Sequence, residues 1–199
     1  MVLTPSTMLP LGTALPAFRL EQVAGDPPAP DGAARLWSTA QLEAGPVLVL
    51  FLCAHCPFVK HIEPELSRLE GDYGGRLQIV ALSSNSTITH PQDGPAGLRA
   101  QAERCGWRFP YLHDREQALA IAFRAACTPD LFLFNREHRL AYRGQLDGSR
   151  PGNDQPLNGR DLRNAIAAVL AGLEPAQPQQ PSIGCNIKWH PGREPAWAR

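Results

Sequence analysis

The sequence lacks an excess of charge of either sign. It contains 19 lysines and arginines and 19 aspartates and glutamates, so its formal net charge is zero. A strongly basic or acidic balance would indicate binding to nucleic acid or to a membrane surface. We therefore expect neither nucleic acid nor membrane as a partner.

Long apolar runs are also missing. No run approaches the roughly 20 residues that cross a bilayer, and no positively charged residue precedes Arg19. A secretory signal peptide needs such a charge before its apolar core. Five cysteines without an export signal are typical of a reducing compartment, where structural disulfides are rare. We expect a cytoplasmic protein.

The sequence has no internal repeat, and its 199 residues suit a single domain with extensions, because single cores commonly hold roughly 100 to 200 residues. The segment EPAQPQQP follows Leu173. Its prolines restrict the backbone and remove amide donors, so we expect an extended linker. The predicted organisation is one domain over residues 1–173, followed by a proline-rich linker and C-terminal tail over residues 174–199.

Apolar periodicity predicts an α/β fold. Residues 47–52 form a continuous apolar run, as in a strand buried on both faces. Apolar residues then recur at helical spacing from Val59 to Leu69. Further strands are expected at 18–20, 77–82, 131–134 and 140–143, and further helices at 96–105, 115–125 and 161–170. This order predicts a central mixed sheet with helices on both faces, a closing β-hairpin and a C-terminal helix.

Cys53 and Cys56 stand where the first buried strand is expected to become a helix. Free amides and the helix dipole stabilise a thiolate at such a position, so we expect Cys53 to be the exposed, low-pKa thiol. Cys56 would lie one turn later and resolve a mixed disulfide. His55, between them, would add positive charge beside the thiolate. The pattern predicts a redox dithiol.

A Cys-x-x-Cys pair is also half of a common zinc site. The sequence offers no second Cys-x-x-Cys and no matching pair of histidines; His61 would lie in the same helix and His90 in a loop. The pattern therefore favours redox chemistry, and we expect no cofactor and no bound metal.

The segment VLVLFLCAHCPFVKHIEPEL resembles the active-site segment of the thioredoxin-like superfamily. It is most similar to a bacterial peroxiredoxin-like or thioredoxin-family redoxin branch, related to the AhpC/TSA proteins. Three further segments resemble the same branch: AACTPDLFLF, YRGQLDGSRPGN and PSIGCNIKW. The resemblance implies a thioredoxin fold with a nucleophilic Cys53, a resolving Cys56 and a cis-proline at Pro129 that faces them. Ala54 stands where the branch often has Asn.

Thr128 and Pro129 come directly before an expected strand. From the resemblance we expect the Thr128 backbone to bind a substrate strand by β-augmentation. Cys127 would then lie near the dithiol, where either a third redox thiol or a buried apolar side chain is consistent with the sequence. Cys105 has no such context, and we expect it to serve in packing.

The tail contains Ile183, Ile187 and Trp189, which give it apolar surface to bury. We expect residues 181–189 to be ordered and to dock on the domain. Cys185 lies within this segment, but the linker is long enough to reach several faces. The sequence does not favour a functional role for Cys185.

The predicted function is thiol-disulfide exchange through Cys53 and Cys56. The expected partners are a disulfide-containing protein or small thiol substrate and an electron-donating reductase or thioredoxin. An antioxidant, thioredoxin-dependent peroxidase is the alternative. A peroxiredoxin-type site has Pro, three residues, Thr, two residues and Cys; Pro46 and Cys53 match this spacing, but Leu50 replaces the threonine. A module that binds metal through Cys53, Cys56 and a histidine is a further alternative.

Overall fold

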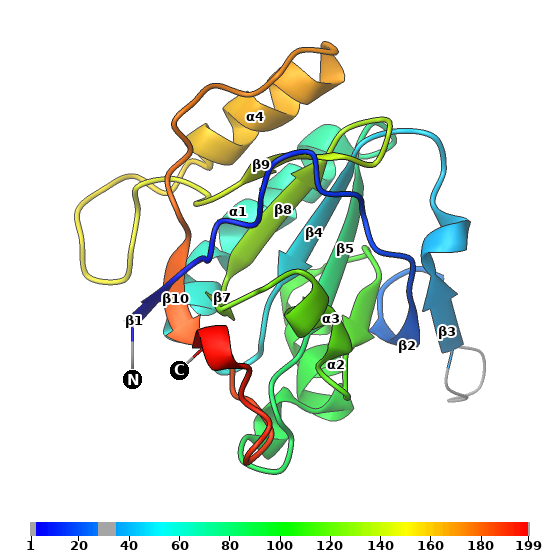
Figure 1. Cartoon of the computed structure of the whole chain (residues 1–199), viewed down its shortest axis with the longest axis vertical. Helices are drawn as coiled ribbons and strands as arrows, with labels where there is room; N and C mark the ends of the chain where they lie inside the picture. Colours follow the sequence, from blue (N-terminus) through cyan, green and yellow to red (C-terminus); the bar gives the residue numbers. More distant parts are fainter. Residues whose placement is uncertain (1–2, 28–34, 199) are drawn as a thin grey trace.

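A seven-stranded mixed sheet forms the centre of the computed structural model, which describes residues 3–27 and 35–198 (Figure 1). The strands lie in the order β3-β2-β6-β5-β4-β8-β9. Their bounds are β3 Arg35–Ser38, β2 Arg19–Ala24, β6 Tyr111–His113, β5 Gln78–Ser83, β4 Val47–Phe51, β8 Asp130–Phe134 and β9 Leu140–Arg143. Central β4 is parallel to β5 and antiparallel to β8, so the sheet is mixed as expected.

All five residues of β4 are buried, because both faces of the sheet are covered. Leu48 and Leu50 pack into an apolar cluster with helices α1 (Pro57–Tyr73), α2 (Pro95–Cys105) and α4 (Arg160–Leu170). Val49 and Phe51 point the other way, toward α3 (Ala118–Ala122). Alternate residues of β4 thus pack into two apolar clusters, one on each face of the sheet. The prediction of helices on both faces is confirmed. No described helix has the length and apolar character needed to span a membrane.

Helix α3 is shorter than predicted. The sequence favoured a helix over residues 115–125, but Gln117 adopts a left-handed conformation with a φ of 61°. The Asp114 carboxylate accepts hydrogen bonds from the amides of Leu119 and Ala120. It thereby satisfies donors that a helix start leaves free, so the helix begins only at Ala118.

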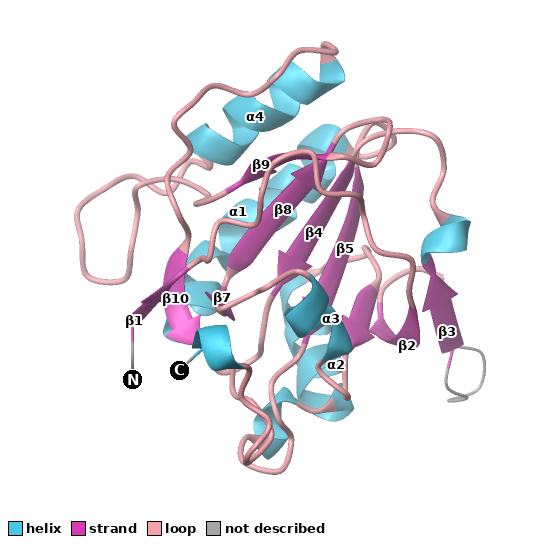
Figure 2. Cartoon of the chain, viewed as in Figure 1, coloured by secondary structure: helices cyan, strands magenta, loops and turns pink. Residues whose placement is uncertain are grey.

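A second, three-stranded sheet joins the two ends of the described chain (Figure 2). Strand β10 (Ile183–Asn186) lies between β1 (Leu3–Pro5) and β7 (Cys127–Thr128), antiparallel to both. Beyond β10, Ile187 and Trp189 are buried in the same apolar cluster as Phe51. The predicted docking of the tail is confirmed.

Candidate redox site

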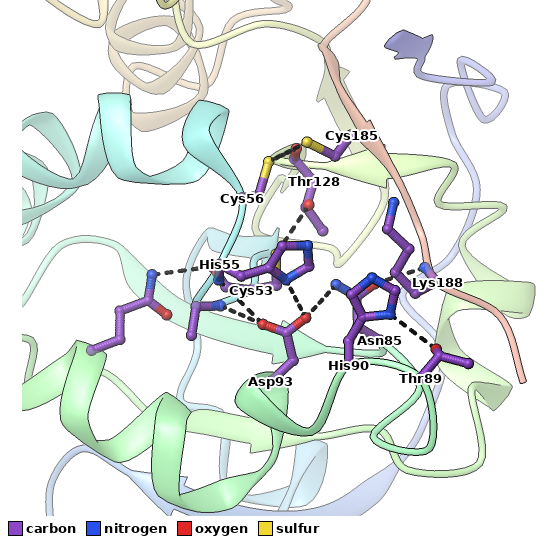
Figure 3. Close-up of polar contacts among 12 residues, drawn as sticks. Cys53, His55, Cys56, Asn85, Thr89, His90, Asp93, Thr128, Cys185 and Lys188 are labelled. Carbon is purple, nitrogen blue, oxygen red and sulfur yellow. Dashed lines mark hydrogen bonds and ion pairs between the residues drawn. The ribbon is translucent and has the colours of Figure 1, made fainter. Parts of the chain in front are cut away.

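Both cysteines of the dithiol lie in the connection between β4 and α1 (Figure 3). The helix begins at Pro57, and Cys56 is its N-cap. Proline suits this first position because its missing amide would have no partner there. The prediction that Cys53 lies at the helix N-terminus is therefore wrong: Cys53 precedes the helix, and Cys56 receives the N-cap position.

Asp93 binds the connection between β4 and α1 through its side-chain carboxylate. It ends a short 3-10 helix, η3 (Pro91–Asp93). One carboxylate oxygen accepts the amides of Ala54 and His55 at 3.0 and 3.2 Å, and the other lies 2.6 Å from the His55 Nδ1 atom and 2.8 Å from the Asn85 Nδ2 atom. Burial alone would raise the pKa of Asp93, but the His55 and Asn85 hydrogen bonds hold it below its usual value. A buried carboxylate thus lies beside the dithiol.

Thr128 contacts both sulfurs of the dithiol. Its Oγ1 atom lies 3.4 Å from the Cys53 Sγ atom, and its carbonyl oxygen lies 3.2 Å from the Cys56 Sγ atom. The Thr128–Pro129 bond is cis, as the resemblance implies. The structure brings together Cys53, His55, Cys56, Thr128 and Pro129, which are the site residues predicted from the sequence.

The thiolate is favoured at Cys56 rather than at Cys53. Hydrogen bonds from Cys53, Cys185 and the Val59 amide lower the pKa of Cys56 to about 5, against the effect of burial. The hydrogen bond to Cys56, burial and the Asp93 charge all raise the pKa of Cys53. Both side chains are buried, with no exposed surface. The expectation of an exposed, low-pKa Cys53 is therefore wrong, because the nearby amides of residues 54 and 55 bind Asp93 instead of the Cys53 sulfur.

His55 lies in the site with its ring hydrogen-bonded to Asp93, and that ring stacks on His90 at a centroid distance of 5.0 Å. Burial and the neighbouring His55 lower the pKa of His90. The described contacts of the His55 ring are thus with Asp93 and His90, not with a sulfur.

A metal could be held by Cys53, His55 and Asp93, whose ligand atoms lie within 4.8 Å of one another. This set differs from the predicted one, since Asp93 replaces Cys56. Each Asp93 oxygen already accepts two hydrogen bonds from protein groups. Its lone pairs are used in positioning the connection, so the arrangement fits a dithiol better than a metal centre.

Strand β10 occupies the edge that the sequence analysis assigned to a substrate. Cys185 pairs with Thr128, and Asn186 pairs with Cys127. We expected a substrate strand to pair with the Thr128 backbone. In this structure the tail of the same chain pairs with it instead. The Cys185 Sγ atom lies 2.9 Å from the Cys56 Sγ atom.

Sequence reasoning missed Asp93, Asn85 and Cys185. One signal for the first two was available: the polar segment that contains them follows β5, the parallel neighbour of β4. The carboxyl ends of adjacent parallel strands meet at one edge of a sheet, where ligands and reactive groups gather. The position of Cys185 depends on a strand pairing across the whole chain, which leaves no local signal.

The mixed sheet, its flanking helices and the position of the dithiol define a thioredoxin-like protein with a thiol redox function. Residues 11–143 match the AhpC/TSA family, and the chain belongs to that family.

Two similar structures are 41% identical to the chain. An uncharacterized conserved protein from Geobacillus kaustophilus has a TM-score of 0.89 over 96% of this chain and 98% of that one. A hypothetical protein from Sinorhizobium meliloti has a TM-score of 0.88 over 95% of this chain and 100% of that one. AhpC from Mycobacterium bovis shares the fold at 18% identity, with a TM-score of 0.59 over 86% and 98%. Among curated proteins, none matches the chain.

Proposed function

We propose that the protein catalyses thiol-disulfide exchange, with Cys53 and Cys56 as its redox dithiol. The observation that carries this proposal is the pair of thiols on either side of Thr128, with the thiolate stabilised at the N-cap of α1. A thiolate is the attacking species in disulfide exchange, and a second thiol nearby completes the reaction.

The proposed reaction has two steps. The Cys56 thiolate, in place of the Cys53 thiolate that the resemblance implies, attacks a substrate disulfide, forms a mixed disulfide and releases one substrate thiolate, which takes up a proton. Cys53 then loses its proton and attacks the Cys56 sulfur, so that the second substrate thiolate leaves and the Cys53–Cys56 disulfide closes. The two electrons gained by the substrate come from the two protein thiols.

The proposed partners are a disulfide-containing protein or small thiol compound as substrate, and a reductase or thioredoxin that returns the disulfide to the dithiol. A cytoplasmic location is proposed with them, because a reducing compartment would keep the five cysteines as thiols. Both active sulfurs are buried, so a substrate sulfur must displace part of their cover before exchange.

Reduction of insulin disulfides, with dithiothreitol as the electron donor, tests the proposal. The wild-type protein is expected to accelerate the reaction, and Cys56→Ser and the double variant Cys53→Ser/Cys185→Ser are each expected to reduce the rate to that of dithiothreitol alone, because the Cys185 sulfur also lies beside Cys56. Cys105→Ser is the matched control and should keep the wild-type rate, because Cys105 lies at the end of α2, outside the site. Wild-type activity in Cys56→Ser or in Cys53→Ser/Cys185→Ser would refute the proposal.

A peroxidase is the second candidate, because the chain belongs to the AhpC/TSA family and the Thr128 hydroxyl lies 3.4 Å from the Cys53 sulfur. Leu50, however, is fully buried on β4 and has no hydroxyl to position a peroxide. We expect only slow consumption of hydrogen peroxide with thioredoxin as reductant. Rapid peroxide turnover without insulin reduction would reverse the order of the two candidates.

A further inference from the structure

Cys185 faces the dithiol because of its register in the small sheet. It lies directly opposite Thr128 in the antiparallel pair of β10 and β7. Directly opposite residues project their side chains to the same face of a sheet, and the Thr128 side chain contacts the Cys53 sulfur. The Cys185 side chain therefore projects to the dithiol as well, and its sulfur lies 2.9 Å from that of Cys56 (Figure 3).

The same register excludes Cys127 from this role. Neighbouring residues on a strand point to opposite faces, so Cys127 points away from the face that Thr128 presents to the dithiol. Its thiol is fully buried and lies 3.5 Å from the Pro129 carbonyl oxygen. Of Cys127 and Cys185, only Cys185 has a sulfur–sulfur contact with the dithiol among the described residues.

Gly184 makes the close approach possible. A Cβ atom at this position would lie 2.1 Å from the Thr128 carbonyl oxygen and 3.2 Å from the Pro129 Cδ atom. Any other residue would force β10 away from β7. The adjacent tail is also anchored beyond the strand, where the Ile187 amide donates to the Ala126 carbonyl.

We infer that Cys185 is a third redox thiol, which exchanges with the Cys53–Cys56 disulfide so that Cys56 alternates between Cys53 and Cys185 as its disulfide partner. This inference rests on the proposed function and extends it. Closure of a disulfide from a separation of 2.9 Å to a bond of about 2.05 Å requires less than about 1 Å of movement.

The exchange needs no added oxidant or reductant. Cys185 loses its proton and attacks the Cys56 sulfur; the Cys56–Cys185 bond forms while the Cys53–Cys56 bond breaks, and the electron pair leaves on Cys53, which takes up a proton. One disulfide replaces another, and Cys53 becomes a free thiol. The disulfide thereby moves from Cys53 to Cys185 on β10, which is itself buried.

The Cys53→Ser variant, treated with oxidised glutathione, tests the inference because Cys56 then has only Cys185 as an internal partner. We expect the Cys56 thiolate to attack oxidised glutathione, which forms a Cys56–glutathione disulfide and releases one reduced glutathione; Cys185 then attacks the Cys56 sulfur and releases the second, leaving an internal Cys56–Cys185 disulfide in digests under non-reducing conditions. Cys53→Ser/Cys185→Ser should instead retain glutathione on Cys56. Cys53→Ser/Cys105→Ser is the matched control and should behave as Cys53→Ser does.

A stable Cys56–glutathione adduct in Cys53→Ser, with a free Cys185 thiol, would overturn the inference. So would the absence of any disulfide on Cys185. The wild-type protein in the same experiment separates this failure from failure of the proposed function: formation of a Cys53–Cys56 disulfide would keep the proposed function intact, whereas two free thiols at Cys53 and Cys56 would overturn both.

Discussion

Asp93 organises the site at the scale of single residues. It binds two amides of the connection and the His55 ring, and its charge acts on the nearest sulfur. A negative charge beside a thiol disfavours its ionisation, so the Asp93 charge adds to the Cys56 hydrogen bond and to burial, the two larger causes of the raised pKa of Cys53. The sequence placed a positive His55 in the role of tuning the thiolate, but the structure assigns the larger electrostatic effect to a residue 40 positions from Cys53.

Asp93→Asn is expected to lower the pKa of Cys53, because it removes a like charge while an amide oxygen can still accept the Ala54 and His55 amides. The pH dependence of Cys53 alkylation, followed by peptide mass spectrometry, measures this change. Asp114→Asn is the control, since Asp114 is equally buried but binds α3. An unchanged midpoint of the pH dependence of Cys53 alkylation in Asp93→Asn would contradict this electrostatic effect of Asp93.

Elements whose signal is local were predictable from the sequence. Strands β4 and β8 and helices α1, α2 and α4 arise from apolar runs and helical periodicity, and the structure has them near the expected bounds. Pro57 also carried the signal for the start of α1, which places Cys56 at the N-cap. Strand β10 was expected only as an ordered tail, because its register with β7 depends on residues far apart in sequence.

The glycine in β10 offers a test at the scale of the element. Gly184→Ala is expected to displace β10 from β7, since the added methyl group would collide with the Thr128 carbonyl. Hydrogen exchange should show faster exchange of the Cys185 and Ile187 amides than in the wild type, by about tenfold or more if opening becomes easier by about 1.4 kcal/mol. Gly148→Ala is the comparison, because no atom lies within 4 Å of its Cβ position and its φ lies outside the left-handed region. Unchanged protection in Gly184→Ala would contradict the proposed packing constraint.

At the scale of the whole molecule, both ends of the described chain cover the redox site. Strand β1 pairs with β10, and β10 pairs with β7 beside the dithiol. Ser6, just after β1, lies close to the buried carboxylate of Asp130 at the start of β8. Neither Asp130 oxygen has a hydrogen bond of ordinary geometry among the described residues, and burial raises the pKa of Asp130 to about 7. Below about pH 7 the fold therefore buries this carboxyl group mainly in its neutral form.

Stability should consequently depend on pH through Asp130. Its folded-state pKa of about 7 exceeds the usual value of 3.8, so the folded state binds more protons and loses stability as pH rises between these values. The loss from this group is up to about 4 kcal/mol. Asp130→Asn should remove this loss of stability. Urea unfolding from pH 4.5 to pH 8 measures the free energy of unfolding of both proteins, and the difference between variant and wild type should widen as pH rises. Other groups, including Cys56, affect both proteins alike. Parallel curves would contradict the assignment.

The central claim is that Cys53 and Cys56 form a reversible redox couple. The most direct measurement is equilibration of the wild-type protein in a series of dithiothreitol redox buffers, followed by alkylation and peptide mapping of each cysteine. The account predicts a two-electron transition in which Cys56 loses its free thiol together with Cys53, or with Cys185 in molecules where the disulfide has exchanged, while Cys105 and Cys127 remain alkylated throughout. Cys53 and Cys56 thiols that both persist at the most oxidising end of the series would contradict it.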